Sequence, residues 1–162
     1  MPKQLEPHNS SGSAATRKRV FKPPTCRWRA LTLVQVALDV RDVNHAITVA
    51  QAAASAGVPF IEIGDPLIKS VGFQAISAVK HPTPGAWIVA EMMSADWGRD
   101  QVVLAAEAGA DVVLLIGPAS IASVSAAADA SRRLGIPAMI DVPEGRLGLP
   151  TASIRYEESS FR

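Results

Sequence analysis

Short apolar runs that recur about twenty-six residues apart are the feature of this chain that most constrains its fold. The runs predict strands at Leu33–Asp39, Phe60–Gly64, Trp87–Met92, Val112–Gly117 and Ala138–Val142. Alanine-rich stretches between them predict helices at Val43–Ala56, Phe73–Lys80, Asp100–Ala108 and Ile121–Leu134. This alternation predicts an α/β fold with a parallel sheet, because each helix returns the chain to begin the next strand in the same direction.

Three of the predicted helices are followed directly by glycine. The glycines are Gly57, Gly109 and Gly135, and each leads into the next predicted strand. Glycine readily adopts the left-handed conformation that ends many helices, so these positions mark helix ends. Each unit of the repeat is therefore a strand and a helix, in three cases with a glycine stop.

Two architectures are built from such units, an open doubly wound sheet and a (β/α)8 TIM barrel. A dinucleotide-binding doubly wound sheet usually carries Gly-x-Gly-x-x-Gly after its first strand, whereas here the first predicted strand runs into Leu38-Asp39-Val40. In the next strand Glu62 alternates with Ile61 and Ile63, as expected where apolar faces meet helices and polar faces point into a barrel. We predict a TIM-type barrel, of which about five units are present.

The two ends of the chain differ from this repeat. Residues 1–29 contain Arg17-Lys18-Arg19 and Pro23-Pro24 without apolar periodicity, and predict a disordered leader. Its basic residues are interpreted as a solvated tail, or as sequence before the true start, in preference to a targeting or nucleic-acid-binding segment. Residues 30–143 form the predicted partial barrel domain, and residues 144–162 an irregular tail.

Composition excludes several classes of function. A formal net charge of +1 at pH 7 gives no electrostatic reason to bind nucleic acid. No apolar run is long enough to span a bilayer, so no membrane segment is expected. The single cysteine, Cys26, excludes an internal disulfide and fits a reducing cytoplasm. We therefore expect a cytoplasmic protein without nucleic-acid or membrane partners.

Acidic residues lie at or near the ends of successive predicted strands. Asp39, Glu62, Glu91 and Asp141 each fall at the carboxyl end of a strand, where barrel enzymes build their active sites. Converging carboxylates can hold Mg²⁺, which commonly binds one or two of them and completes its shell with water and substrate oxygens. Each acid taken alone is equally explained as a solvated strand end or a helix cap. Their repeated placement favours a site.

Several motifs resemble those of a known family. They are Leu33–Asp39, Ile61–Gly72 and Glu107–Val113. Together they resemble the orotidine monophosphate decarboxylase suprafamily (HUMPS family), in particular its 3-hexulose-6-phosphate synthase branch, over roughly residues 33–142. The segment Pro66-Leu67-Ile68-Lys69 with Gly72 looks like the synthase rather than the related ketogulonate-phosphate decarboxylases. The resemblance implies a phosphate-binding TIM barrel.

The resemblance also implies roles for individual residues. Glu62 and Glu91 would hold Mg²⁺, and Asp39, Glu91 and Asp96 would form the catalytic set. Asp39 and Lys69 would bind substrate, although a solvated lysine explains Lys69 equally well. Asp96 would reach into the active site of a partner subunit, which implies a homodimer. The implied reaction is the aldehyde-lyase coupling of formaldehyde to ribulose 5-phosphate.

The sequence departs from the family pattern in two ways. The family motif Asp-x-Lys-x-x-Asp reads here Glu91 to Asp96, so its first acid is lengthened and its lysine is replaced by Met93, which is interpreted as a side chain filling barrel volume. The repeat also stops after about five of eight units, which suggests a truncated or frame-shifted product or a barrel completed by a partner chain. The alternatives are a ketogulonate-phosphate or orotidine-phosphate decarboxylase of the same suprafamily, or a non-catalytic remnant that acts only in binding.

Overall fold

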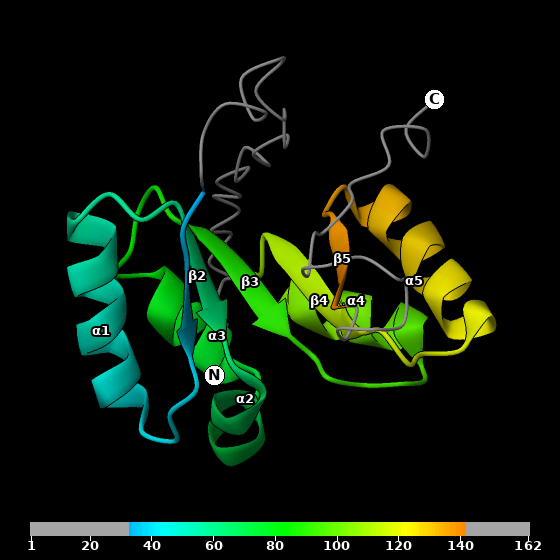
Figure 1. Cartoon of the computed structure of the whole chain (residues 1–162), viewed down its shortest axis with the longest axis horizontal. Coiled ribbons are helices and arrows are strands. Elements are labelled where there is room, and N and C mark those ends of the chain that lie inside the picture. The colour runs from blue at the N-terminus through cyan, green and yellow to red at the C-terminus, as the bar shows by residue number, and fades with distance from the viewer. Residues whose placement is uncertain (1–32, 142–162) are drawn as a thin grey trace, which may run out of the picture.

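The computed structural model describes residues 33–141 and contains one parallel five-stranded sheet (Figure 1). The strands are β1 (Gln35–Leu38), β2 (Phe60–Ile63), β3 (Trp87–Glu91), β4 (Val112–Ile116) and β5 (Ala138–Asp141). The helices are α1 (Val43–Ser55), α2 (Asp65–Val71), α3 (Gln74–Lys80), α4 (Gly98–Glu107) and α5 (Ile121–Leu134). Four predicted helices and all five predicted strands are confirmed, with ends that differ by up to two residues.

The order of the strands decides between the two predicted architectures. Neighbours in the sheet are neighbours in the chain, from β1 to β5, and every pair is parallel. A doubly wound sheet reverses its strand order part-way and places helices on both faces. Here the order never reverses within the described residues, as in the wall of a (β/α)8 barrel.

Side chains alternate between the two faces of the sheet as the sequence predicted. One face packs against the helices in a core that includes Ile61, Ile88 and Val113 together with Ala50 of α1 and Val102 of α4. The opposite face carries a smaller cluster, formed by Val89, Val112 and Leu114 with Phe60 and Met139 packed against it. This second face corresponds to a barrel interior and also carries Glu62 and Glu91.

Helix α2 was not predicted from the sequence. It follows β2 after one residue, and its second position is Pro66, which is tolerated in a first helical turn because that N–H needs no partner within the helix. At seven residues it is too short to show a clear apolar period. Lys69, which falls outside the four predicted helices, lies in this helix.

The three predicted glycine stops are confirmed. Gly57, Gly109 and Gly135 have φ values of 82°, 98° and 68°, which lie in the region that favours glycine. Each follows the end of a helix and lets the chain turn into the next strand.

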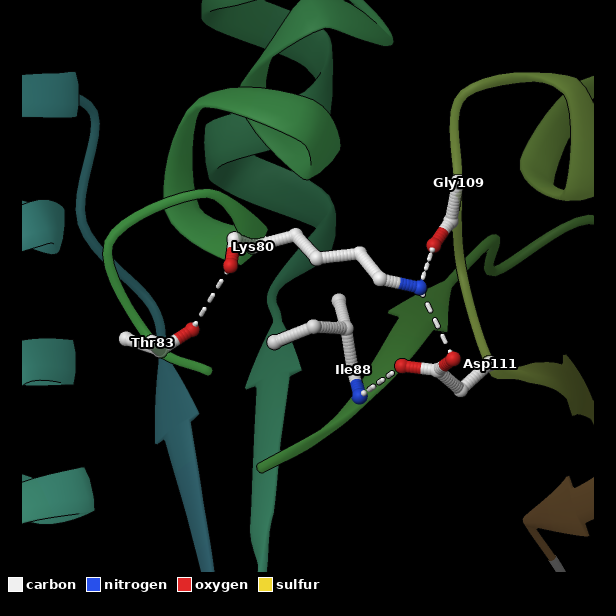
Figure 2. A network of polar contacts seen from close by, with 5 residues as sticks. All are labelled: Lys80, Thr83, Ile88, Gly109 and Asp111. Atoms are coloured by element: carbon white, nitrogen blue, oxygen red, sulfur yellow. Dashed lines mark hydrogen bonds and ion pairs between the residues drawn. The ribbon is translucent and has the colours of Figure 1, made fainter. Parts of the chain in front are cut away.

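A polar network joins β3 and β4 near their amino ends (Figure 2). Lys80 Nζ lies 2.8 Å from Asp111 Oδ1 and donates to the carbonyl of Gly109 at 2.6 Å. Asp111 Oδ2 accepts the backbone N–H of Ile88 at 2.9 Å. This Lys80–Asp111 network pairs both charges within the protein. It lies at the amino-terminal end of the sheet, which in barrels contributes to stability, whereas the carboxyl-terminal end carries the active site.

Between residues 33 and 141, none of the helices has the length and hydropathy needed to cross a membrane. The predicted leader, residues 1–29, and the predicted tail, residues 144–162, lie outside the described residues, as does Cys26.

Candidate active site

Glu62 lies at the centre of the candidate site. It sits in β2 between Ala37 of β1 and Val89 of β3, and only 7% of its surface is exposed. Its neighbours along β2, Ile61 and Ile63, point to the helix side and are fully buried. The alternation that buries these isoleucines therefore directs the Glu62 carboxyl group to the barrel-interior face.

The environment of Glu62 raises the pKa of its carboxyl group to about 7, from an ordinary value of 4.5. Burial is the largest cause, followed by the negative charges of Glu91 and Asp39, while that of Asp141 adds a smaller contribution. The hydrogen bond from Gln35 acts in the opposite direction. The other three acids predicted from strand ends therefore lie close enough to act on Glu62, and we call these four residues the acid cluster.

Two further groups orient the acid cluster. Gln35 of β1 donates a hydrogen bond from Nε2 to Glu62 Oε2. Glu91, at the end of β3, accepts the backbone N–H of Asp65 at 2.8 Å through Oε2. Asp65 is the first residue of α2, whose preceding residue, Gly64, has no side chain that could cap the helix. Glu91 thus satisfies one of the unpaired N–H groups at the start of α2.

Asp96 lies apart from the acid cluster. It is exposed in the loop between β3 and α4, where its Oδ1 accepts the backbone N–H of Trp97 at 2.8 Å. Its charge is not among those that raise the pKa of Glu62. Two residues of this loop, Met93 and Trp97, have φ values of 40° and 58°, in a region that bulky residues seldom adopt.

Met93 lies in the loop that follows β3. It is half-buried and belongs to neither apolar cluster among the described residues. Its predicted inward orientation depended on strand alternation, which ends with β3 at Glu91 and is interrupted by the positive φ of Met93.

Lys69 lies on α2 with 71% of its side chain exposed. Its Nζ is 2.9 Å from Asp65 Oδ2, one helical turn earlier. Such an exposed pair is weak and exchanges readily with solvent or another anion.

The donors present fit Mg²⁺ better than a softer metal. Within residues 33–141, no group of three or more histidine, cysteine, aspartate or glutamate side chains is arranged to hold a metal ion by itself. Mg²⁺ needs only one or two protein carboxylates, because water and substrate oxygens complete its octahedron. Glu62 and Glu91 offer such hard oxygen donors on adjacent strands, and their mutual repulsion would be relieved by a cation.

Comparison with known proteins identifies the lineage. The family model for orotidine 5'-phosphate decarboxylase / HUMPS matches residues 32–149. The chain belongs to this family. That confirms the resemblance inferred from the strand-end motifs, and the similarity extends across all the residues that the structure describes.

The relatives that this chain resembles in sequence include a bifunctional enzyme and a single-function synthase, as their names state. The bifunctional enzyme Fae/Hps of Methanoculleus marisnigri is 34% identical over 125 residues, which cover 77% of this chain and 30% of the relative. The 3-hexulose-6-phosphate synthase of Mycobacterium gastri is 30% identical over 125 residues, which cover 77% of this chain and 58% of that enzyme. This chain thus spans less than two thirds of either relative.

Solved structures support the same family assignment. A crystal structure of 3-hexulose-6-phosphate synthase matches with a TM-score of 0.66 and 30% identity, covering 71% of this chain and 55% of that one. A 3-keto-L-gulonate-6-phosphate decarboxylase from Vibrio cholerae matches with a TM-score of 0.65 and 29% identity, covering 70% and 52%. These matches confirm that the five-stranded sheet is part of a family barrel.

Three contributors to the site were missed from the sequence. Gln35 shares the inward face predicted for its strand, but its hydrogen bond to Glu62 depends on the register between β1 and β2. The N–H of Asp65 belongs to the backbone, so no residue type signals it. Gly64 follows Glu62 by two residues, and only the packing around it shows why it is glycine.

Proposed function

We propose that this chain provides a Mg²⁺-dependent sugar-phosphate site of the 3-hexulose-6-phosphate synthase type, an aldehyde-lyase that joins formaldehyde to ribulose 5-phosphate. The observation that carries the proposal is the acid cluster itself. A buried Glu62 beside other carboxylates is costly without a cation, and it lies where family barrels place their chemistry.

Each residue has a distinct role in this proposal. Glu62 and Glu91 hold Mg²⁺, and the bond from Glu91 to the Asp65 N–H fixes the orientation of one of its oxygens. Asp39 accepts hydrogen bonds from the sugar hydroxyl groups. Asp96, exposed in its loop, extends to the site of a second copy in a homodimer, and Lys69 pairs with the substrate phosphate in exchange for Asp65.

The proposed reaction is a carbon–carbon bond formation. A proton leaves C1 of ribulose 5-phosphate, C1 attacks the carbon of formaldehyde, and the formaldehyde oxygen takes up a proton. All atoms of both substrates remain in the hexulose phosphate. Mg²⁺ bound at the carboxylates supplies a Lewis acid that orients the sugar oxygens and stabilises developing negative charge.

Met93 supports a second candidate, a chain that binds sugar phosphate without turning it over. A thioether neither donates a proton nor neutralises an oxyanion, so the position where the family pattern has lysine contributes no charge here. Loss of one electrostatic donor commonly lowers kcat by roughly a hundredfold or more. A decarboxylase of the same family is a third candidate, and its product would be carbon dioxide.

Titration calorimetry with ribulose 5-phosphate in Mg²⁺ tests the proposal. We expect saturable binding that is lost in Glu62→Gln and retained in Lys80→Met, which removes a charge near the amino ends of β3 and β4. A folded chain that binds no ribulose 5-phosphate would contradict the proposal. Where binding is found, formation of hexulose phosphate from formaldehyde, release of carbon dioxide from ketogulonate phosphate, or neither, separates the three candidates.

A further inference from the structure

Gly64, between β2 and α2, is not required by its backbone conformation. Its φ of −63° and ψ of 150° are extended values that any residue adopts. Gly57 and Gly135, in contrast, have positive φ values and open space around the position of a Cβ. The reason for glycine at position 64 must therefore be found in its contacts.

A side chain at position 64 would collide with the end of β1. A Cβ built on Gly64 lies 2.3 Å from Asp39 Oδ1, 2.9 Å from the carbonyl oxygen of Leu38 and 3.2 Å from the Asp39 Cα. The shortest of these distances is to the carboxylate. Asp39 thus occupies the volume that a side chain at position 64 would fill.

The register of the sheet explains this contact. Leu38 pairs with Ile63 at the ends of β1 and β2. Asp39 and Gly64 directly follow these two residues and therefore lie side by side. Gly64 is buried, whereas Asp39 is exposed, so the carboxylate lies over the glycine at the carboxyl end of the sheet. The negative charge of Asp39 acts on Glu62, two residues before Gly64.

We infer that Gly64 is a positioning residue, whose missing side chain holds open the place of the Asp39 carboxylate in the candidate site. This inference rests on the proposed function for its consequence, which is binding of the sugar phosphate. Alanine at position 64 would force Asp39 out of that place and so reproduce the loss of Asp39. The contact with the Leu38 carbonyl is a separate, purely structural effect.

A double-mutant cycle separates the two effects. Gly64→Ala, Asp39→Ala and the double variant are compared with the wild type for ribulose 5-phosphate affinity in Mg²⁺. We expect each single variant to weaken binding at least about tenfold, with the double variant no weaker than Asp39→Ala. Single effects that multiply in the double variant, or wild-type affinity in Gly64→Ala, would overturn the inference.

Urea unfolding midpoints provide a readout that needs no ligand. Gly64→Ala should lower the midpoint more in the wild type than in the Asp39→Ala background, because the second variant has lost the colliding carboxylate. An equal fall in both backgrounds, or failure of both to fold, would assign the effect to the Leu38 carbonyl and overturn the inference. If the wild type binds no ribulose 5-phosphate, the proposed function fails, and the midpoints still decide whether Gly64 accommodates Asp39.

Gly98→Ala serves as the matched control. A Cβ at Gly98 would lie 2.0 Å from the carbonyl oxygen of Ser123, so this substitution also disturbs a close contact, here between α4 and α5. Its effect on the midpoint should be the same with Asp39 or Ala at position 39. A dependence on position 39 as large as that of Gly64→Ala would show a general loss of stability and overturn the inference.

Discussion

The two ends of this sheet differ in whether their charged side chains are paired with an opposite charge. At the amino ends, Lys80 and Asp111 neutralise each other, and backbone groups satisfy their remaining bonding capacity. At the carboxyl ends, Glu62 lies among other acids, and within residues 33–141 Glu62 and Glu91 accept hydrogen bonds from neutral donors, the Gln35 amide and the Asp65 N–H. A network that is complete contributes stability, whereas one that lacks a counter-charge indicates a ligand site.

The largest expected effect is on the pH dependence of stability. Because folding raises the pKa of Glu62 from 4.5 to about 7, the folded chain retains a proton that the unfolded chain has released between these values. The contribution of Glu62 to the free energy of unfolding is therefore fully present below about pH 4.5 and is lost as the pH rises to about 7, a loss of about 3 kcal/mol. Urea unfolding at a series of pH values from about 4 to 8 measures this change in the free energy of unfolding.

Glu62→Gln should remove most of this loss and make the chain more stable than wild type at pH 8. It should do so while abolishing ribulose 5-phosphate binding in Mg²⁺. A Glu62→Gln variant with the wild-type pH profile would contradict the raised pKa of Glu62.

A cation introduced at position 93 makes the carboxyl end more like the amino end. Met93→Lys restores the lysine of the family motif, and we expect the rate of hexulose phosphate formation to rise by about a hundredfold. Met93→Leu is the matched control and should leave the rate unchanged. No gain with lysine would support a chain that only binds.

Removing the ammonium group of Lys80 leaves the amino end of the sheet, like the carboxyl end, with an acid that lacks a counter-charge. Lys80→Met leaves the Asp111 charge, whose side chain is 15% exposed, without its partner, and should lower the free energy of unfolding by about 2 kcal/mol. Affinity for ribulose 5-phosphate should not change. A loss of affinity in a folded Lys80→Met chain would show that the two ends are coupled.

The smallest effect is expected from the exposed ion pair on α2. Lys69 pairs with Asp65, and 71% of the Lys69 side chain is exposed. Lys69→Met should therefore change the free energy of unfolding by less than about 0.5 kcal/mol. Comparison of Lys69→Met with Lys80→Met shows whether burial determines how much a lysine–aspartate pair contributes to the free energy of unfolding. Equal losses from the two variants would contradict that explanation.

The sequence predicted the units of the fold because each unit is locally encoded. Apolar alternation defined β2 and β3, and glycine defined the ends of α1 and α5. Helix α2 could not be predicted in the same way, because seven residues containing a proline give no measurable period.

The acids of the site were also predictable, since position along a strand determines the end of the sheet at which a side chain lies. Their partners were not. The bond from Gln35 depends on register, the bond to Glu91 comes from a backbone N–H, and the role of Gly64 depends on an atom it lacks. Sequence patterns reveal residue types, whereas these contacts are set by the packing of separate strands.

If the acid cluster is a cation site, Mg²⁺ must change the titration of Glu62. Carbon-13 NMR of the side-chain carboxyl groups, recorded against pH with and without saturating Mg²⁺, measures the pKa of Glu62 in each state. We expect a pKa of about 7 without Mg²⁺ and a value well below that with it. A pKa that is raised but unmoved by Mg²⁺ would contradict it.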